Sequence, residues 1–402
     1  MKCLLIRRSA AWAVGATLAL TLIRPVYAQP GPSRTLPQPP EAATEPAGFL
    51  TEPMIVERAV LFGDRHFGNG ELTDGWYVDA FNMIPGAGWL SIGPGYRRWF
   101  NKDSVFADAS AAISSRNYRT AQGRIEFRRL ARGRLLVGSQ VRLQDFRSVA
   151  FFGEGPDTLE SDRSAYRLRS RNIVGYATLR PMRWLGIGAS AGWLKPTIGS
   201  EGQPAFVHTE GSITADTRDF AGRPTRGALI RAAVANYTDQ DAGAFSFRRY
   251  DGEAAGFLPL ADSRLVLAAH GWLVGTDTNE GRQVPFYLQP ALGGHNSLRS
   301  FADYRFHGRN MLLVNLEARV AMMTHVDAAA FVDAGNVAGR LSDLNLDKRS
   351  YGAGLRLHSR RQTFARLDVA HGSEGWRVVF QLTDPLNLAR LSRRTAAAPF
   401  VH

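Results

Sequence analysis

The chain has 402 residues and a formal net charge of +13, and nearly all of its 49 basic residues are arginine. These arginines are spread along the chain rather than clustered, so the charge does not indicate a nucleic-acid-binding protein. The only cysteine is Cys3, close to the amino terminus. The rest of the chain therefore has no disulfide and no cysteine-ligated metal site.

Residues 1–28 have the features of a secretory signal peptide. Lys2, Arg7 and Arg8 precede an apolar run from Ser9 to Ile23, and residues 26–28 (Val-Tyr-Ala) offer a small-residue cleavage site. The alternative is an uncleaved membrane anchor, but the apolar run has only 15 residues, and a spanning helix needs roughly 20. The pattern favours a cleaved signal and an exported protein.

Residues 29–85 are predicted to be a proline-rich linker followed by the start of the folded domain. Seven prolines fall between residues 29 and 53, among Gly, Ala, Thr and Glu. This composition favours an extended segment that cannot build a core.

Residues 86–382 alternate between apolar and polar side chains in runs of ~10 residues, separated by Gly, Asp, Asn and Pro. Helical periods are scarce. Strands that are apolar on one side and charged on the other, following a signal peptide, favour a transmembrane β-barrel with its charges toward a wet lumen. By this rule Arg167, Arg169 and Arg171, which share one face, are predicted to face the lumen.

The predicted fold is all-β, a 16-stranded antiparallel transmembrane β-barrel with an inward-folded loop. A sixteenth strand is expected because bacterial single-chain barrels have even numbers, and 74–84, 148–160 and 282–290 are its alternative positions. Residues 383–402 are predicted to be a C-terminal tail. The fifteen clear strands are predicted at 87–98, 103–115, 119–129, 134–146, 165–180, 182–195, 205–217, 226–237, 244–257, 262–274, 309–322, 325–336, 349–358, 361–371 and 375–382.

The loop LGGHNSLRSFADYRF (292–306) places Arg299 between apolar residues. The next two strands carry acids on the face opposite their apolar side chains, Glu317 in the first and Asp333 in the second. If the loop folds into the barrel, the Arg299 guanidinium can pair with these carboxylates, since its planar fork suits bidentate contact. The alternative is a solvated Arg299, with the two acids merely lining a pore.

These segments resemble the barrel of the outer-membrane assembly-factor superfamily, also called the bacterial surface antigen family, to which BamA and TamA belong. That family has an arginine-glycine-aromatic tip on a long lumenal loop, received by an F-x-D-x-G strand. A further similar segment is DTRDFAGRPTRG (216–227), and FFGEGPDT (151–158) is a weaker match. The matching residues are Gly293, Gly294, Leu298, Arg299, Ser300 and Phe301 in the loop, Glu317, Phe331, Asp333 and Gly335 in the two strands, and Asp216, Arg218, Asp219, Pro224 and Gly227 in the further segment.

The sequence departs from the family in two respects. Ser300 stands where the family usually has glycine, and a residue with a Cβ is less free to adopt positive φ, so the loop tip is expected to differ. The family's periplasmic repeat domains do not fit into residues 29–85. The chain therefore resembles a short, barrel-only branch.

Two classes of function remain open. The resemblance implies a multi-pass barrel in the outer membrane of a Gram-negative bacterium, with the lipid bilayer and inserted or exported polypeptides as partners. The other class is an anion-favouring channel or a structural outer-membrane protein. A co-purifying periplasmic partner would favour the first class, and anion-selective conductance without a partner would favour the second. The sequence does not specify an oligomeric state.

No enzyme, cofactor or metal is predicted. Residues 188–192 match the G-x-S-x-G pattern of serine hydrolases, but that pattern needs a strand–turn–helix elbow. Here it lies inside an alternating strand, LGIGASAGW. A structural strand is therefore predicted at this position.

Overall fold

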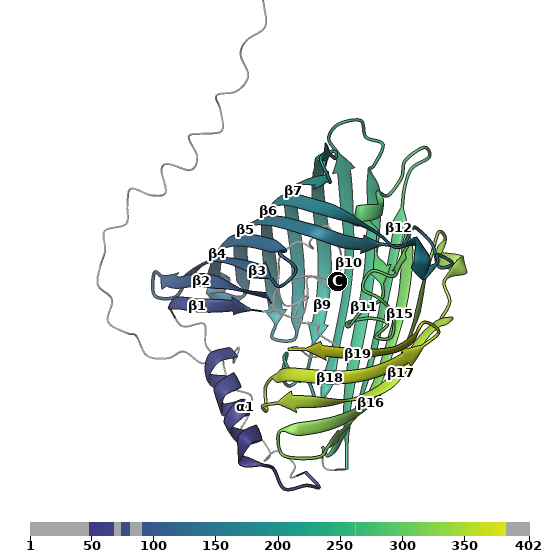
Figure 1. Cartoon of the computed structure of the whole chain (residues 1–402). Coiled ribbons are helices and arrows are strands. Elements are labelled where there is room, and N and C mark those ends of the chain that lie inside the picture. The colour runs from purple at the N-terminus through teal and green to yellow at the C-terminus, as the bar shows by residue number, and fades with distance from the viewer. Residues whose placement is uncertain (1–47, 68–73, 81–90, 262, 383–402) are drawn as a thin grey trace, which may run out of the picture.

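The computed structural model describes residues 48–67, 74–80, 91–261 and 263–382 (Figure 1). The predicted signal peptide, the tail at 383–402 and parts of the predicted linker lie outside the described residues. One large sheet dominates the fold and curls around an interior, so that its first and last strands both come round to the near side of Figure 1.

Each of the fifteen predicted ranges overlaps a strand, although several strands extend beyond the predicted ends, and β1 falls within 74–84, the first of the three alternatives. The short strands β8 (Glu201–Gly202), β13 (Ala291–Leu292) and β14 (Phe306–His307) were not predicted. The long strands are β1 (Gly75–Ala80), β2 (Ser91–Phe100), β3 (Val105–Ser114), β4 (Arg119–Leu130), β5 (Leu135–Phe151), β6 (Ser164–Met182), β7 (Leu185–Ile198), β9 (Phe206–Asp216), β10 (Gly227–Asp239), β11 (Phe247–Leu260), β12 (Leu265–Asp277), β15 (Asn310–Ala321), β16 (Val326–Ala338), β17 (Lys348–His358), β18 (Thr363–Gly372) and β19 (Gly375–Gln381).

The long strands pair antiparallel in chain order, from β1 through to β19. Sequential antiparallel pairing is the expected result of short connections between neighbouring strands. Within the described residues no backbone pairing joins β19 to β1, so these two strands are the ends of the sheet. An all-β antiparallel sheet is therefore observed.

The two faces of the sheet differ as the alternation predicted for most strands. On β17 the Leu355 side chain is 45% exposed on the outer face, whereas the neighbouring Arg356 is 1% exposed and points into the interior. On β18 the same relation holds between the exposed Leu367 and the buried Asp368. The exterior is therefore apolar and the interior carries the charges, the arrangement expected of a barrel in lipid.

The prediction for the arginines of β6 is wrong. Arg167, Arg169 and Arg171 are exposed on the outer face, on the same side of the strand as Ile173. The side chains between them, which include Leu168 and those of residues 170 and 172, are buried in the interior. Neutral polar groups and a leucine fill the interior here, which leaves the charges outside.

The helix α1 (Met54–Phe67) was also not predicted. It begins directly after Pro53, whose fixed φ suits a helix start, and carries Glu57 in its first turn, where a carboxylate is favourable. The preceding segment is tied to the β15–β16 turn, because the Leu50 N–H donates to the Met322 carbonyl at 2.8 Å. No helix among the described residues has the length and apolar character needed to cross a membrane.

The G-x-S-x-G pattern lies within β7, as predicted. Ser190 pairs in register with Tyr176 and Glu210 of the neighbouring strands. A residue in the middle of a paired strand has no strand–turn–helix elbow, so the motif is structural.

Candidate functional site

The candidate site is the long connection between β12 and β15, residues 278–309, which folds into the interior of the sheet. Two glycines allow its turn: Gly293 and Gly294 have φ of 110° and 94°, values that side chains rarely permit. A Cβ on Gly293 would also lie 2.2 Å from the Ala302 carbonyl oxygen. The backbone conformation therefore requires glycine at both of these positions, which match the family pattern.

Apolar side chains hold both arms of this connection. Leu298 and Phe301 flank Arg299 and are 0% and 1% exposed, in a cluster with side chains of β12, β15 and β16. Gly335 of β16 makes room for the loop, because a Cβ there would lie 3.0 Å from Leu292 Cδ1. Burial of apolar surface thus brings the polar tip of the loop against the wall of the sheet.

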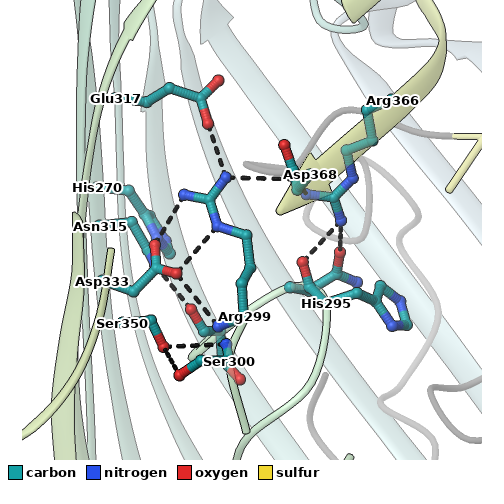
Figure 2. A network of polar contacts seen from close by, with 12 residues as sticks. His270, His295, Arg299, Ser300, Asn315, Glu317, Asp333, Ser350, Arg366 and Asp368 are labelled. Carbon is teal, nitrogen blue, oxygen red and sulfur yellow. Dashed lines mark hydrogen bonds and ion pairs between the residues drawn. The ribbon is translucent and has the colours of Figure 1, made fainter. Parts of the chain in front are cut away.

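Arg299 meets both predicted acids (Figure 2). Its Nε and Nη2 donate to the two Asp333 oxygens at 2.9 and 2.8 Å, a bidentate pair, and its Nη1 donates to Glu317 Oε2 at 2.9 Å. The guanidinium carbon lies 3.4 Å from the ring centre of Phe331, over its face. Glu317 of β15 and Asp333 of β16 both face the interior, as the alternation of their strands predicted. One guanidinium therefore bridges these two neighbouring strands.

The ion pairs continue across two further strands. On β17, Arg356 donates to Glu317 Oε2 at 3.0 Å and also to Asp368 of β18. Arg366 of β18 donates to Asp368 Oδ2 at 3.3 Å and to the His295 carbonyl at 2.7 Å, which holds a second point of the loop. These residues were not predicted as site residues. The sequence did indicate their direction, because each alternates with outward-facing apolar residues on a predicted strand.

Two more polar residues of β15 complete the network, and neither was predicted as a site residue. Asn315 donates to Asp333 Oδ1 at 2.8 Å and to the Ser297 carbonyl at 2.9 Å. The Arg319 Nε donates to Glu317 Oε1 at 2.8 Å. We call the seven charged members the Arg299 network: Arg299, Glu317, Arg319, Asp333, Arg356, Arg366 and Asp368.

The Arg299 network contains four cations and three anions, all of them buried. Every carboxylate in it contacts at least one guanidinium, which offsets the cost of removing the charges from water. Burial by itself would lower the pKa of the Arg299 guanidinium, but Asp333, Glu317 and Asp368 outweigh burial and raise that pKa above its ordinary value. Arg299 is therefore charged at any physiological pH.

Ser300 stands where the family usually has glycine, but its backbone does not adopt a positive φ. Its N–H donates to Ser350 Oγ at 3.0 Å, and the two hydroxyl oxygens lie 2.6 Å apart. Gly372 of β18 provides space, because a Cβ there would lie 2.2 Å from Ser300 Oγ. The substitution for glycine is thus accommodated by a matching gap in the wall.

The FFGEGPDT segment also contacts the inward connection. Gln289 donates to the Glu154 carboxylate at 2.7 Å, and Arg305 donates to Thr158 Oγ1 at 2.7 Å. Arg305 also forms an ion pair with Glu374, between β18 and β19, at 2.6 Å. This weaker family match therefore lies against the loop that carries Arg299.

The DTRDFAGRPTRG segment forms the β9–β10 turn and is not part of the Arg299 network. Asp216 accepts two hydrogen bonds from the Arg218 guanidinium, at 2.9 and 2.8 Å. Asp219 accepts from the Thr225 N–H at 3.0 Å, and Pro224 is buried. Gly227 has φ 94°, and a Cβ there would lie 2.3 Å from the Thr217 carbonyl oxygen. These five predicted residues shape a turn at the other end of the sheet.

Comparison with known proteins agrees with this architecture. Residues 200–372 match the Omp85 superfamily domain. This part of the chain therefore carries an Omp85 superfamily domain. BamA from Haemophilus ducreyi lacking POTRA domains 1–3 is similar in structure to this chain, with a TM-score of 0.59 and 14% sequence identity. That similarity covers 76% of this chain and 69% of the BamA chain.

Two CdiB structures are also similar in fold. CdiB from Escherichia coli has a TM-score of 0.54 at 13% identity, and CdiB from Acinetobacter baumannii has 0.50 at 13% identity. Each comparison covers 76% of this chain, which spans 61% and 58% of the two CdiB chains. A sequence search among curated proteins gave no match. At these identities the structural neighbours establish the fold alone.

Proposed function

We propose that this protein is an Omp85-type barrel, closed, 16-stranded and multi-pass, in the outer membrane of a Gram-negative bacterium. We further propose that it acts in inserting polypeptides into that membrane or exporting them across it. The Omp85 domain match, the fold shared with BamA and CdiB, and the apolar exterior support this proposal. In this assignment residues 86–382 are the barrel, 1–28 a signal peptide, 29–85 the linker with the start of the barrel, and 383–402 a tail.

The observation that carries the proposal is the character of the two ends of the sheet. The end strand β19 has seven residues, whereas β15 and β16 have 12 and 13, so a contact of β19 with β1 is limited to this short length. A short contact between β1 and β19 would have few backbone hydrogen bonds and would open at low cost. An open edge presents unpaired N–H and C=O groups, with which an incoming strand can pair.

The Arg299 network would serve this function by fixing the wall next to the weak contact. Its ion pairs tie β15, β16, β17 and β18 to the inward loop. A wall held in this way keeps its shape while the β1–β19 contact opens. The role of Arg299, Asp333 and Glu317 as a lock on the loop is part of the proposal.

A disulfide across the ends of the sheet tests the proposal. The chain without residues 1–28 has no cysteine, so each engineered pair is unique. Cysteine would be placed at Trp76 or Val78 of β1 together with Val378 or Phe380 of β19, all four being exposed on the outer face. Leu355→Cys with Leu367→Cys is the matched control, because these residues are register partners on β17 and β18.

The readout is the rate at which a urea-unfolded eight-stranded outer-membrane barrel folds into liposomes that contain each variant. Reduced protein should accelerate folding of this probe, the oxidised β1–β19 pair should lose the acceleration, and the oxidised control pair should retain it. Equal acceleration with the ends joined would contradict the proposed route. Anion-selective conductance in planar bilayers, with no acceleration by any form, would favour the channel function instead.

A further inference from the structure

An exposed group of basic side chains lies on the outer face of the sheet, away from the Arg299 network. Three of them are Arg167, Arg169 and Arg171 of β6, all exposed. The fourth is Lys195 of β7, whose side chain is 37% exposed and which is the register partner of Arg171. We call these four residues the outer basic patch.

The outer basic patch directly borders the apolar exterior. In the adjacent row of the outer face, Ile173 and Trp193 are register partners and are 48% and 38% exposed. Two residues along a strand correspond to roughly 7 Å, so Arg171 and Lys195 lie about one row beyond the apolar surface. A Trp followed by basic side chains is the order found where a membrane protein passes from hydrocarbon to headgroups.

The carboxylates nearby neutralise only part of this charge. Arg167 donates to Asp145 at 2.8 and 2.6 Å, and Lys195 lies 3.7 Å from Asp241. Neither Arg169 nor Arg171 forms an ion pair with a carboxylate of the described residues. Among the described residues, Arg169 donates to the Gly199 carbonyl at 3.3 Å. It is also the register partner of Asp145, but Arg167 already donates to both oxygens of that carboxylate. The outer basic patch therefore keeps two guanidinium groups available to an external anion.

The strands β10 and β11 do not carry the same excess of positive charge at this end of the outer face. On β10, beyond the apolar rows, the outer face carries Asn236 and Thr238, and Arg248 of β11 is the register partner of Asp277. The outer basic patch lies at the same end of the sheet as the connection at residues 278–309, which is long. Long connections mark the extracellular side of bacterial barrels and short turns the periplasmic side. The patch thus faces the outer leaflet.

We propose that the outer basic patch binds the phosphate groups of an outer-leaflet glycolipid, with the acyl chains of that lipid against the apolar row below. This inference rests on the membrane placement in the proposed function. Guanidinium groups contact phosphate oxygens in bidentate geometry, and clustered basic residues at a membrane surface attract anionic headgroups. Phosphate supplies the negative charge that Arg169 and Arg171 lack, and the lipid supplies the apolar part that the row of Ile173 and Trp193 matches.

The test uses the full mature chain folded in zwitterionic detergent and titrated with diphosphorylated lipid A in the same micelles. Binding is measured by native mass spectrometry on three proteins: the unchanged chain, the triple variant Arg167→Gln, Arg169→Gln, Arg171→Gln, and a matched control. The control replaces Arg132, Arg134 and Arg183 by Gln, because these exposed arginines lie at the opposite end of the same region. Heat-modifiable migration on gels reports the folding of each protein separately, so a failure of the barrel assignment is distinguished from a failure of binding.

The unchanged chain and the control should bind lipid A alike, and the triple variant should bind on the order of 100-fold more weakly, at roughly fivefold per arginine. Three results would overturn the proposal. The first is equal binding by the triple variant, and the second is equal binding of dephosphorylated lipid A, which would leave only an apolar contact. The third is displacement of lipid A by excess inorganic phosphate, which would indicate a site for a free anion.

Discussion

Two groups of arginines in this molecule follow the same sequence alternation but end on opposite faces of the sheet. On β17 and β18, Arg356 and Arg366 point inward and are each 1% exposed. On β6, Arg167 and Arg171 are exposed on the outer face. The inward pair meets the inward-facing carboxylates of Glu317 and Asp368. The outward pair alternates with side chains that pack in the interior. Alternation therefore defines two faces, but the partners available on each side decide which face is inside.

The comparison also predicts different energetics for the two groups. A buried guanidinium that loses its partner is left as an uncompensated charge, whereas an exposed one is solvated by water. Substitutions in the Arg299 network should therefore affect stability strongly, and substitutions in the outer basic patch should affect it little.

The largest effect is expected for Asp333→Ala and Arg299→Ala. Either change leaves a buried charge without its bidentate partner, and the loss of stability should be on the order of 3–5 kcal/mol where the site is dry. The double variant should be little worse than either single one, because the two residues act as a unit. Urea titration of heat-modifiable migration on gels measures the three variants, and strictly additive losses would show that the two residues are not coupled.

A comparable but smaller effect is expected for Glu317→Gln. The Glu317 carboxylate accepts hydrogen bonds from Arg299, Arg319 and Arg356, and an amide keeps its shape without its charge. The loss should be about 3 kcal/mol, by the same titration, because three buried cations lose a shared anion. Glu210→Gln, a change at another inward acid of the sheet, is the comparison variant. A loss below about 0.5 kcal/mol would indicate that water reaches the network.

A modest effect is expected for Ser300→Ala at the loop tip. The change removes the hydroxyl contact with Ser350 but keeps the Ser300 backbone N–H as a donor. The cost of one such hydrogen bond is about 1 kcal/mol. Ser300→Gly should cost slightly more, because glycine adds conformational freedom to the unfolded chain. Stabilisation by Ser300→Gly, measured in the same titration, would show that the loop tip is strained by the serine.

The smallest effect is expected at the exposed ion pair between Arg167 and Asp145. Its side chains are 42% and 24% exposed, so a double-mutant cycle with Arg167→Gln and Asp145→Asn should give a coupling of at most about 1 kcal/mol. High salt should reduce this coupling, whereas the coupling between Arg299 and Asp333 should persist. Equal coupling energies at the two sites would remove the distinction between the two groups of arginines.

The sequence predicted the strands because their alternation is long and regular, and it predicted the contact of Arg299 with Glu317 and Asp333. That contact could be predicted because side chains alternate between the two faces of a strand. Both acids lie on the face opposite Leu316 and Val332, whose apolar side chains are exposed. Their role as a lock stays a prediction. The Omp85 domain match agrees with the resemblance seen in the motifs.

Other features could not be predicted because they depend on contacts between distant segments. Arg366 reaches the His295 carbonyl, 71 residues away in sequence, and Gly372 accommodates Ser300 across the interior. The outward direction of the β6 arginines depends on which side chains fill the interior beside Leu168. The helix α1 was missed because its short apolar pattern follows a proline-rich segment.

The inward connection touches both walls of the curled sheet, and this has a mechanical consequence. Val284, Tyr287 and Leu288 pack with side chains of β5, β6, β7, β9 and β11, while Leu298 and Phe301 pack with β12, β15 and β16. The connection is therefore a cross-brace between opposite sides of the sheet. A brace of this kind resists flattening of the cross-section. Local opening of the sheet should therefore be concentrated at β1 and β19, and amide hydrogen exchange should be fastest there.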